Sequence, residues 1–252
     1  MIRSEVRERV ARVQLDRPGK KNALTPQMYA ELGAALRAAE EDAGVRAVLL
    51  HGTAECFTAG NDVGDFLNVP RQPGSSPARA LFEVLPWMAK PVVAAVGGPA
   101  IGIGSTMLLH CDLVYAAPNA RFQLPFVPLG IVPEFGSSFL LPRLAGYQRA
   151  AELLLLGRPF TAQQAHEAGI VTAVVAQDVL IDHSLKIALS LAALPPESVR
   201  LTKKLMKARH APALAATIEE ETRIFGERLA SPEAKEALSA FLEKRKPDFS
   251  RF

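Results

Sequence analysis

Three short stretches of this sequence hold residues suited to chemistry, and the first is a turn rich in glycine. Residues 97–104 contain four glycines in eight positions and lie between an apolar run, 92–96, and a segment of helical character, 105–110. Glycine lets another atom approach the backbone closely, and the first N–H groups of a helix have no partner within it. We therefore expect the turn to present N–H donors to a developing oxyanion. The alternative is a tight strand-to-helix corner with no chemical role.

Two common phosphate-binding patterns do not fit this turn. The dinucleotide pattern G-x-G-x-x-G fails because Gly102-Ile103-Gly104 lacks the third glycine. The P-loop pattern fails because no Gly-Lys-Ser/Thr follows. A pair of donors for a negative oxygen therefore suits the turn better than a nucleotide phosphate.

The other two stretches supply further backbone donors and one acid. Residues 57–62, Phe-Thr-Ala-Gly-Asn-Asp, follow an apolar run at 47–50, and their small side chains leave the backbone N–H groups accessible. Residues 122–138 hold a single carboxylate, Glu134, among mainly apolar neighbours. An acid in apolar surroundings is disfavoured as an anion, so we expect the pKa of Glu134 to be raised toward the range useful for proton transfer. The alternative is a surface acid in the first turn of a helix that Pro133 begins.

The order of the three stretches resembles that of one known family. Phe-Thr-Ala-Gly-Asn-Asp at 57–62, Gly-Pro-Ala-Ile-Gly-Ile-Gly at 98–104 and Leu-Pro-Phe…Pro-Glu at 124–134 are similar to motifs of the enoyl-CoA hydratase/isomerase (crotonase) superfamily. The resemblance implies an α/β fold with a core of repeated ββα units wound as a superhelix. It also implies an acyl-CoA thioester as the substrate, whose thioester oxygen lies in an oxyanion hole formed by the main-chain N–H groups of Asn61 and Ile103.

The acids at the family's catalytic positions indicate which reaction to expect. Hydratases of the family use two glutamates, but the corresponding positions here hold Thr106 and Phe126. Glu134 instead resembles the single base of the Δ3,Δ2-enoyl-CoA isomerase branch, in which a Pro-Glu pair follows an aromatic residue. One base is sufficient to move a double bond, since it takes a proton from C2 and returns it to C4. We therefore expect an isomerase that converts 3-enoyl-CoA to trans-2-enoyl-CoA.

Other functions stay open at this point. A hydratase or a thioester hydrolase of the same family would need an acid near the thioester from elsewhere in the chain. A non-catalytic acyl-CoA binder would need no acid, although a lone glutamate in an apolar pocket favours chemistry.

The resemblance also implies which residues contact the acyl-CoA. Lys20 or Lys21, both in the loop 16–22, carries a point charge that suits a phosphate of the nucleotide, and a solvated loop lysine is the alternative. Phe126 would keep water out of the cleft. The implied contacts are Lys20, Ala23, Ala59, Gly60, Asp62, Val63, Gly102 and Phe126. No cofactor is expected beyond the coenzyme A that the substrate carries.

Composition limits the partners and the compartment. The chain of 252 residues carries a net charge of +3 with no dense basic tract, which argues against nucleic acid as a partner. Its two cysteines, Cys56 and Cys111, suggest neither a disulfide framework nor a metal cluster. The N-terminal residues do not resemble a secretory signal, and no apolar run reaches membrane-spanning length. We therefore expect a cytoplasmic protein that binds no metal and no membrane.

The elements that position these residues follow from hydrophobic periodicity and from turn residues. Strands are predicted at 6–15 (a hairpin), 45–51, 92–96, 111–117 and 170–175. Helices are predicted at 25–43, 78–88, 139–144, 147–156 and 161–168, and beyond residue 178 only helices follow, at 182–193, 197–210, 213–229 and 232–244. The chain is therefore divided into an α/β core, residues 1–194, and a C-terminal helical region, residues 195–252.

The helical region has apolar faces that need a partner. Members of the family use such a region to build trimers or pairs of trimers, so a homotrimer or a hexamer is expected. Glu219-Glu220-Glu221 within it is interpreted as a solvated face or a subunit contact.

Overall fold

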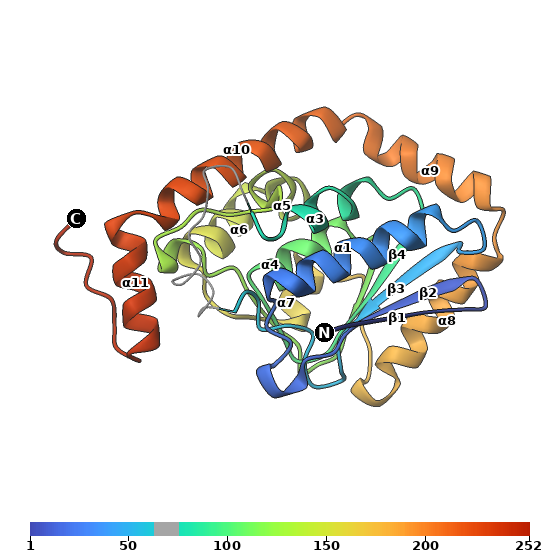
Figure 1. The fold of residues 1–252 in the computed structure, drawn as a ribbon, viewed down its shortest axis with the longest axis horizontal. Coiled ribbons are helices and arrows are strands. Elements are labelled where there is room, and N and C mark those ends of the chain that lie inside the picture. Colours follow the sequence, from blue (N-terminus) through green and yellow to red (C-terminus); the bar gives the residue numbers. More distant parts are fainter. Residues whose placement is uncertain (63–75) are drawn as a thin grey trace.

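The larger of two sheets lies between layers of helix, and Figure 1 shows its strands β1 to β4 between α1 and α8. The computed structural model describes residues 1–62 and 76–252, so Val63 of the predicted acyl-CoA contacts lies outside it. The strand order is β1-β2-β3-β4-β6-β9, antiparallel between β1 and β2 and parallel elsewhere. The strands are β1 Ile2–Arg7, β2 Val10–Leu15, β3 Ala47–His51, β4 Val92–Val96, β6 Leu113–Ala116 and β9 Ala173–Val174.

The smaller sheet includes residues 99–101 of the glycine-rich stretch 97–104, which the sequence predicts as a turn. Its order is β5-β7-β8, with β5 Pro99–Ile101, β7 Arg121–Gln123 and β8 Phe160–Thr161. β5 follows β4 along the chain and β7 follows β6, so each of these two pairs contributes one strand to the larger sheet and one to the smaller sheet. Thr58 adds to the edge of β5 through an isolated parallel bridge with Ala100. The sequence does not predict this sheet, because strands of two or three residues show no period.

The helices surround the sheets and begin near their predicted positions. They are α1 Pro26–Glu41, α3 Arg79–Phe82, α4 Ile103–Thr106, α5 Ser137–Ala145, α6 Tyr147–Ala151, α7 Ala162–Glu167, α8 Leu180–Ala193, α9 Pro196–Ala208, α10 Ala211–Leu229 and α11 Pro232–Leu242. Short 3₁₀ turns are η1 Pro18–Lys20, η2 Leu85–Trp87, η3 Met107–His110, η4 Val127–Leu129 and η6 Gln177–Val179, and η5 Glu152–Leu156 is a π-helix that continues α6. α1 begins where the sequence predicts, because the Thr25 hydroxyl accepts the Met28 N–H at 3.2 Å and Pro26 follows it.

Alternate residues of the central strands face opposite layers of helix. In β3, Val48 and Leu50 belong to the core that includes residues of α1, whereas Ala47 and Leu49 pack in a second cluster with residues of α8. All four side chains are fully buried. This is the pattern expected of parallel strands with helices on both faces, and Figure 1 shows α1 and α8 on opposite sides of the sheet.

The helix predicted at 78–88 is wrong in its extent. α3 ends at Phe82, and the chain continues as the separate turn η2. Pro86 lies inside this turn, where it lacks an N–H and its ring would collide with the preceding helical turn. The continuous helix is broken for this reason.

The four helices predicted beyond residue 178 are present, with ends shifted by a few residues. α9 and α10 arch over the protein, and α11 lies at the end opposite to α9 (Figure 1). α10 packs against α5, and α11 packs against η4. The C-terminal helices therefore contact the part of the chain that carries Glu134. The domain boundary at 194/195 stays a prediction.

No single helix of the described residues is long and apolar enough to cross a membrane; Gln177–Ala193 and Pro196–Ala208 meet that test only as a pair bent by 106°. The cytoplasmic location stays a prediction from the sequence.

Candidate active site

The first arm of the candidate site is the segment 58–62, which turns sharply at Gly60. The φ of Gly60 is +88°, and a Cβ there would lie 2.7 Å from the carbonyl oxygen of Ile101. Only glycine allows this approach without strain. The Thr58 hydroxyl accepts the Gly60 N–H at 3.1 Å, which closes the turn against β5.

Asn61 is fixed through both its side chain and its neighbours. Its Oδ1 accepts the Tyr29 hydroxyl at 2.5 Å. Leu24 bridges the flanking residues, donating its N–H to the Gly60 carbonyl at 2.8 Å and accepting the Asp62 N–H at 3.0 Å. In such a parallel bridge the N–H of the middle residue points away from the partner strand. The Asn61 N–H is therefore directed away from Leu24.

The second arm is the segment 101–104, which leads from β5 into α4. Gly102, with a φ of +56°, precedes the helix, so Ile103 is the first helical residue and its N–H has no acceptor within α4. Gly104 lets α4 pack on the first arm, since a Cβ there would lie 2.6 Å from the Thr58 methyl carbon. Within residues 1–62 and 76–252, neither the Ile103 nor the Asn61 N–H donates to another protein group.

A cavity of about 360 Å³ adjoins the two arms. Six of the predicted site residues line it: Ala59, Gly60, Asn61, Gly102, Phe126 and Glu134. Ile103 does not line the cavity itself, but it follows Gly102 directly and its side chain is fully buried. The cavity therefore brings together all three stretches that the sequence singles out.

Glu134 lies between η4 and α5 with 6% of its surface exposed. It is therefore not the surface acid of the alternative interpretation. Among the described residues that line the cavity it is the only carboxylic acid. Its carbonyl oxygen accepts the Ser137 N–H at 3.2 Å and the Ser137 hydroxyl at 2.7 Å, which tightens the turn into α5.

Phe135, the next residue, packs its ring against two other aromatic rings. The ring stacks on Phe82 at 4.1 Å between centroids and lies 4.0 Å from the His110 ring. His110 Nε2 is 2.8 Å from the Phe135 carbonyl oxygen, and since a carbonyl only accepts, Nε2 carries the proton. Complete burial lowers the pKa of His110 to about 3, so the imidazole is neutral near pH 7.

Glu221 of α10 corrects the prediction made for the acidic triplet. It is 6% exposed, and its carboxylate accepts the N–H groups of Gly136 and Ser138 at 2.5 and 2.9 Å. Burial raises the pKa of Glu221, opposed by these hydrogen bonds. The prediction of a solvated face or subunit contact is wrong for this residue, since its carboxylate is buried within the protein. The sequence could not show this, because three adjacent acids give no sign that one of them turns inward. Glu220 is exposed and pairs with Arg223.

The residues predicted to bind the nucleotide end lie outside the lining of this cavity. Lys20 is exposed at the end of η1. Ala23 and Asp62 are joined by Arg17, whose guanidinium donates to the Ala23 carbonyl at 2.8 Å and to the Asp62 carboxylate at 2.9 Å. The sequence gives no sign of this bridge, because Arg17 and Asp62 are 45 residues apart.

The C-terminal region supplies lining residues that the motifs do not indicate. Helices α10 and α11 contribute Phe225, Leu229, Ala237, Leu238 and Phe241, and the segment after α11 contributes Arg245 and Pro247. Apolar spacing along 213–229 and 232–244 indicates that these helices have a buried face, but it does not identify what that face covers.

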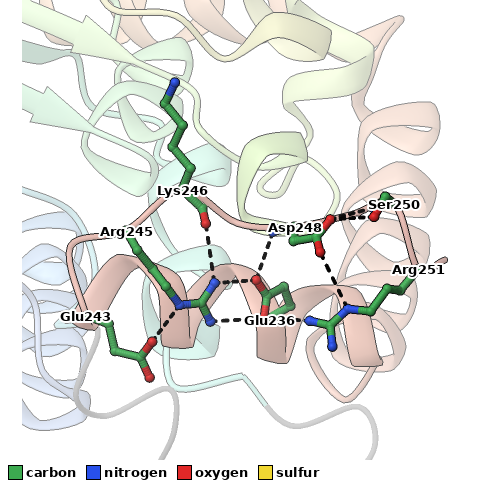
Figure 2. A network of polar contacts seen from close by, with 7 residues as sticks. All are labelled: Glu236, Glu243, Arg245, Lys246, Asp248, Ser250 and Arg251. Atoms are coloured by element: carbon green, nitrogen blue, oxygen red, sulfur yellow. Dashed lines mark hydrogen bonds and ion pairs between the residues drawn. The ribbon is translucent and has the colours of Figure 1, made fainter.

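The segment after α11 folds back around Glu236 (Figure 2). Arg245 donates to both oxygens of Glu236 at 2.5 and 3.0 Å, and the Asp248 N–H donates at 2.8 Å. The hydrogen bonds from Arg245 lower the pKa of Glu236 to about 2. Arg245 also donates to Glu243 at 2.6 Å. Arg245 is the only arginine in the described lining of the cavity, and its positive charge is thus paired with two carboxylates.

Metal-binding groups are sparse in the described residues. No three His, Cys, Asp or Glu side chains gather within residues 1–62 and 76–252 in a way that would hold a metal ion. The absence of a metal and of a cofactor stays a prediction.

Comparison with known protein families identifies the class of protein that has this fold and cavity. The family model described as "Enoyl-CoA hydratase/isomerase" matches residues 5–251. The chain belongs to the enoyl-CoA hydratase/isomerase family, and the predicted crotonase-like α/β fold is confirmed.

Three relatives illustrate the range of the family. The 1,2-epoxyphenylacetyl-CoA isomerase of Escherichia coli K12 is 37% identical over 99% of this chain and 98% of its own length. The 2,3-dehydroadipyl-CoA hydratase of the same organism is 35% identical over 96% of this chain and 95% of its own. A crystal structure of an enoyl-CoA hydratase/isomerase from Pseudoalteromonas atlantica T6c superposes with a TM-score of 0.94 at 43% identity, covering 99% of both chains. The family therefore includes both isomerases and hydratases.

Proposed function

We propose that the protein is an isomerase that converts a 3-enoyl-CoA to the trans-2-enoyl-CoA. The observation that carries this proposal is the buried Glu134, which is the only carboxylic acid in the described cavity lining. A double-bond shift needs a single base, whereas hydration usually needs two polar groups that position water and deliver a proton.

The first step is the removal of a proton from C2 of the substrate. The Glu134 carboxylate takes the proton, and the C–H electron pair moves into a dienolate whose negative charge lies on the thioester oxygen. The N–H groups of Asn61 and Ile103 donate to that oxygen. Loss of one donor of this kind typically costs about 3–4 kcal/mol of transition-state stabilisation, so the hole is as necessary as the base.

The second step returns the same proton to C4. The protonated Glu134 donates it, the double bond forms between C2 and C3, and the thioester carbonyl is restored. No water is consumed and no redox group takes part. Phe126, which lines the cavity and is 3% exposed, supports the proposal because an apolar wall keeps water from competing at the dienolate.

The residues at the two positions where hydratases carry glutamates also favour isomerisation. Thr106 is fully buried with its hydroxyl 3.5 Å from the Ile103 carbonyl oxygen, and Phe126 cannot ionise. Hydration is the second candidate, since a relative with 35% identity is named a hydratase.

The rest of the substrate belongs to the same proposal. Lys20 offers an exposed ammonium to a phosphate of coenzyme A, and the Arg17 bridge holds Ala23 and Asp62 side by side as a rim for the nucleotide. The coenzyme A of the substrate is the only cofactor-like group required.

A homotrimer or a pair of trimers is also part of the proposal. Large apolar side chains are exposed on α9 and α6, with 77% of Leu205, 66% of Met206 and 72% of Tyr147 accessible. Exposed apolar surface of this kind supports contacts between subunits.

Replacement of Glu134 by Gln tests the reaction directly. The amide has the size of the acid but cannot take a proton, so turnover of trans-3-hexenoyl-CoA should fall by about 10²–10⁴-fold. The rate is followed by the absorbance of the conjugated product, and binding of saturated hexanoyl-CoA should stay close to that of the wild type. Glu220→Gln, which alters an exposed acid, is the matched control.

Two results would contradict the proposal. Unchanged isomerisation by the Glu134→Gln variant would remove the base from the mechanism. Rapid hydration of crotonyl-CoA by the wild type, without isomerisation of the 3-enoyl thioester, would favour the hydratase.

A further inference from the structure

We propose that Glu221 is a positioning residue for the catalytic acid: its carboxylate, on α10, fixes the turn that aims Glu134 into the cavity. This inference rests on the proposed role of Glu134. It goes beyond that role because it assigns the geometry of the base to a residue of the C-terminal helical region.

The turn after Glu134 has a backbone shape that does not maintain itself. Phe135 and Gly136 both have left-handed backbones, with φ values of +61° and +71°. For Phe this region is strained, and such a residue persists only where its surroundings hold it in place. At Gly136 the positive φ would strain any other residue, and a Cβ would lie 2.4 Å from the Leu214 Cδ1 of α10, so that the leucine side chain would have to shift. The turn therefore depends on contacts from other elements.

Glu221 supplies the contacts that close the turn. One carboxylate oxygen accepts the Gly136 N–H at 2.5 Å, and the other accepts the Ser138 N–H at 2.9 Å and the Ser138 hydroxyl at 2.5 Å. Gly136 and Ser138 lie at the start of α5, where N–H groups have no partner within the helix. Gly136 occupies the cap position but has no side chain to serve it. A carboxylate from 85 residues further along the chain replaces the missing cap.

The carboxylate is committed to this turn. Glu221 is buried, and no Lys, Arg or His side chain of the described residues forms an ion pair with it. A buried charge is costly unless hydrogen bonds satisfy it, and the three donors of the turn do so. The charge and the strained backbone thus stabilise each other, two residues away from Glu134.

The same helix also borders the substrate cavity. Phe225, one helical turn after Glu221, lines the cavity together with Glu134. α10 therefore contributes a wall for the acyl group through one residue and an anchor for the base through another. Loss of the anchor alone should move the carboxylate of Glu134 while leaving the walls in place.

The test compares Glu221→Gln with Glu220→Gln. The amide keeps the volume of the acid, but its NH₂ end cannot accept a hydrogen bond, so at least one donor of the turn loses its partner. We expect kcat for trans-3-hexenoyl-CoA to fall on the order of 10²-fold with KM little changed, since misplacement by about 1 Å has an effect of that size. Glu220→Gln should behave as the wild type. Ser138→Ala, which removes only one donor, should give a smaller fall in kcat.

A second readout does not depend on the reaction. Amide hydrogen exchange in residues 134–140 of the substrate-free protein should be faster in Glu221→Gln than in Glu220→Gln, whether or not the wild type isomerises a 3-enoyl-CoA. Should the wild type lack turnover, the proposed function fails while the exchange comparison still decides this inference. Equal exchange in the two variants, or a kcat for Glu221→Gln equal to that of the control, overturns it. If Glu221→Gln does not fold, Ser138→Ala carries both measurements with the same criteria.

Discussion

The two proposed donors share one feature of backbone geometry. Asn61 follows Gly60 and Ile103 follows Gly102, and both glycines have a positive φ, +88° and +56°. A positive φ is available to glycine at low cost and turns the next peptide N–H out of the direction that the strand would give it. The requirement differs between the two, because a Cβ would collide with Ile101 at position 60 but would meet open space at position 102.

Gly60→Ala tests whether the first arm sets the position of the Asn61 N–H. The added Cβ would lie 2.7 Å from the Ile101 carbonyl oxygen, so the arm must shift away from β5. A shift of about 1 Å in an oxyanion donor should lower kcat/KM on the order of 10²-fold. The measurement is steady-state isomerisation of trans-3-hexenoyl-CoA.

The matched control for Gly60→Ala is Gly226→Ala. Gly226 is exposed in α10, and a Cβ there has no atom within 4 Å. This variant should retain the activity of the wild type. If Gly60→Ala were as active as Gly226→Ala, the arm would not hold the donor.

Among the elements, those with local signals are predicted and those defined by distant contacts are not. α1 is predicted because Thr25 and Pro26 cap its start, and β4 because five buried apolar residues follow one another. The smaller sheet is missed because its strands have only two or three residues each, too few to show a period. The break at Pro86 is missed because apolar spacing continues across it.

The candidate site divides in the same way. The two arms and Glu134 are predicted because glycine spacing and a lone acid are visible within a few residues. The wall formed by Phe225 and Phe241 is not, since a helical period indicates a buried face without naming its partner. The inward turn of Glu221 depends on donors 83 and 85 residues earlier, which no local pattern reveals.

The contact of His110, in η3, with Phe135, next to Glu134, predicts a pH dependence of stability. The pKa of His110 is about 3 in the folded protein against 6.5 for an unperturbed histidine, because burial disfavours the charged ring. Below pH 6.5 the unfolded chain therefore gains a proton that the folded chain does not, so this contribution to stability is complete above pH 6.5 and is lost as the pH falls. At about 1.4 kcal/mol per pH unit, the loss reaches roughly 2 kcal/mol near pH 5.

The variant His110→Gln isolates this effect. Its amide can still donate to the Phe135 carbonyl but does not titrate. The unfolding free energy, measured in urea between about pH 7 and pH 5 at one protein concentration, should decline by roughly 2 kcal/mol more in the wild type than in the variant. Parallel declines in both proteins would show that folding does not lower the pKa of this histidine.

At the scale of the whole molecule, the cavity is lined by segments that lie far apart in the sequence. Residues 59–61 form part of the lining beside β5, and Arg245 and Pro247 border it after α11. Figure 1 shows α11 at the far end of the protein from α9, with the terminal segment lying beyond it. Terminal segments stay ordered only where something fixes them, and the contacts around Glu236 do so here (Figure 2).

Glu236→Gln should therefore change substrate affinity without changing the chemical step. The amide cannot accept Arg245 at both ends, so the segment that carries Pro247 loses its anchor and must be ordered again when the acyl group binds. That ordering should raise KM for a medium-chain 3-enoyl-CoA by about two- to tenfold, with kcat close to that of the wild type. Glu243→Gln removes only the more exposed partner of Arg245 and should have a smaller effect. A fall in kcat at unchanged KM would instead link this segment to the base, because the cavity wall would then have no separate role in binding.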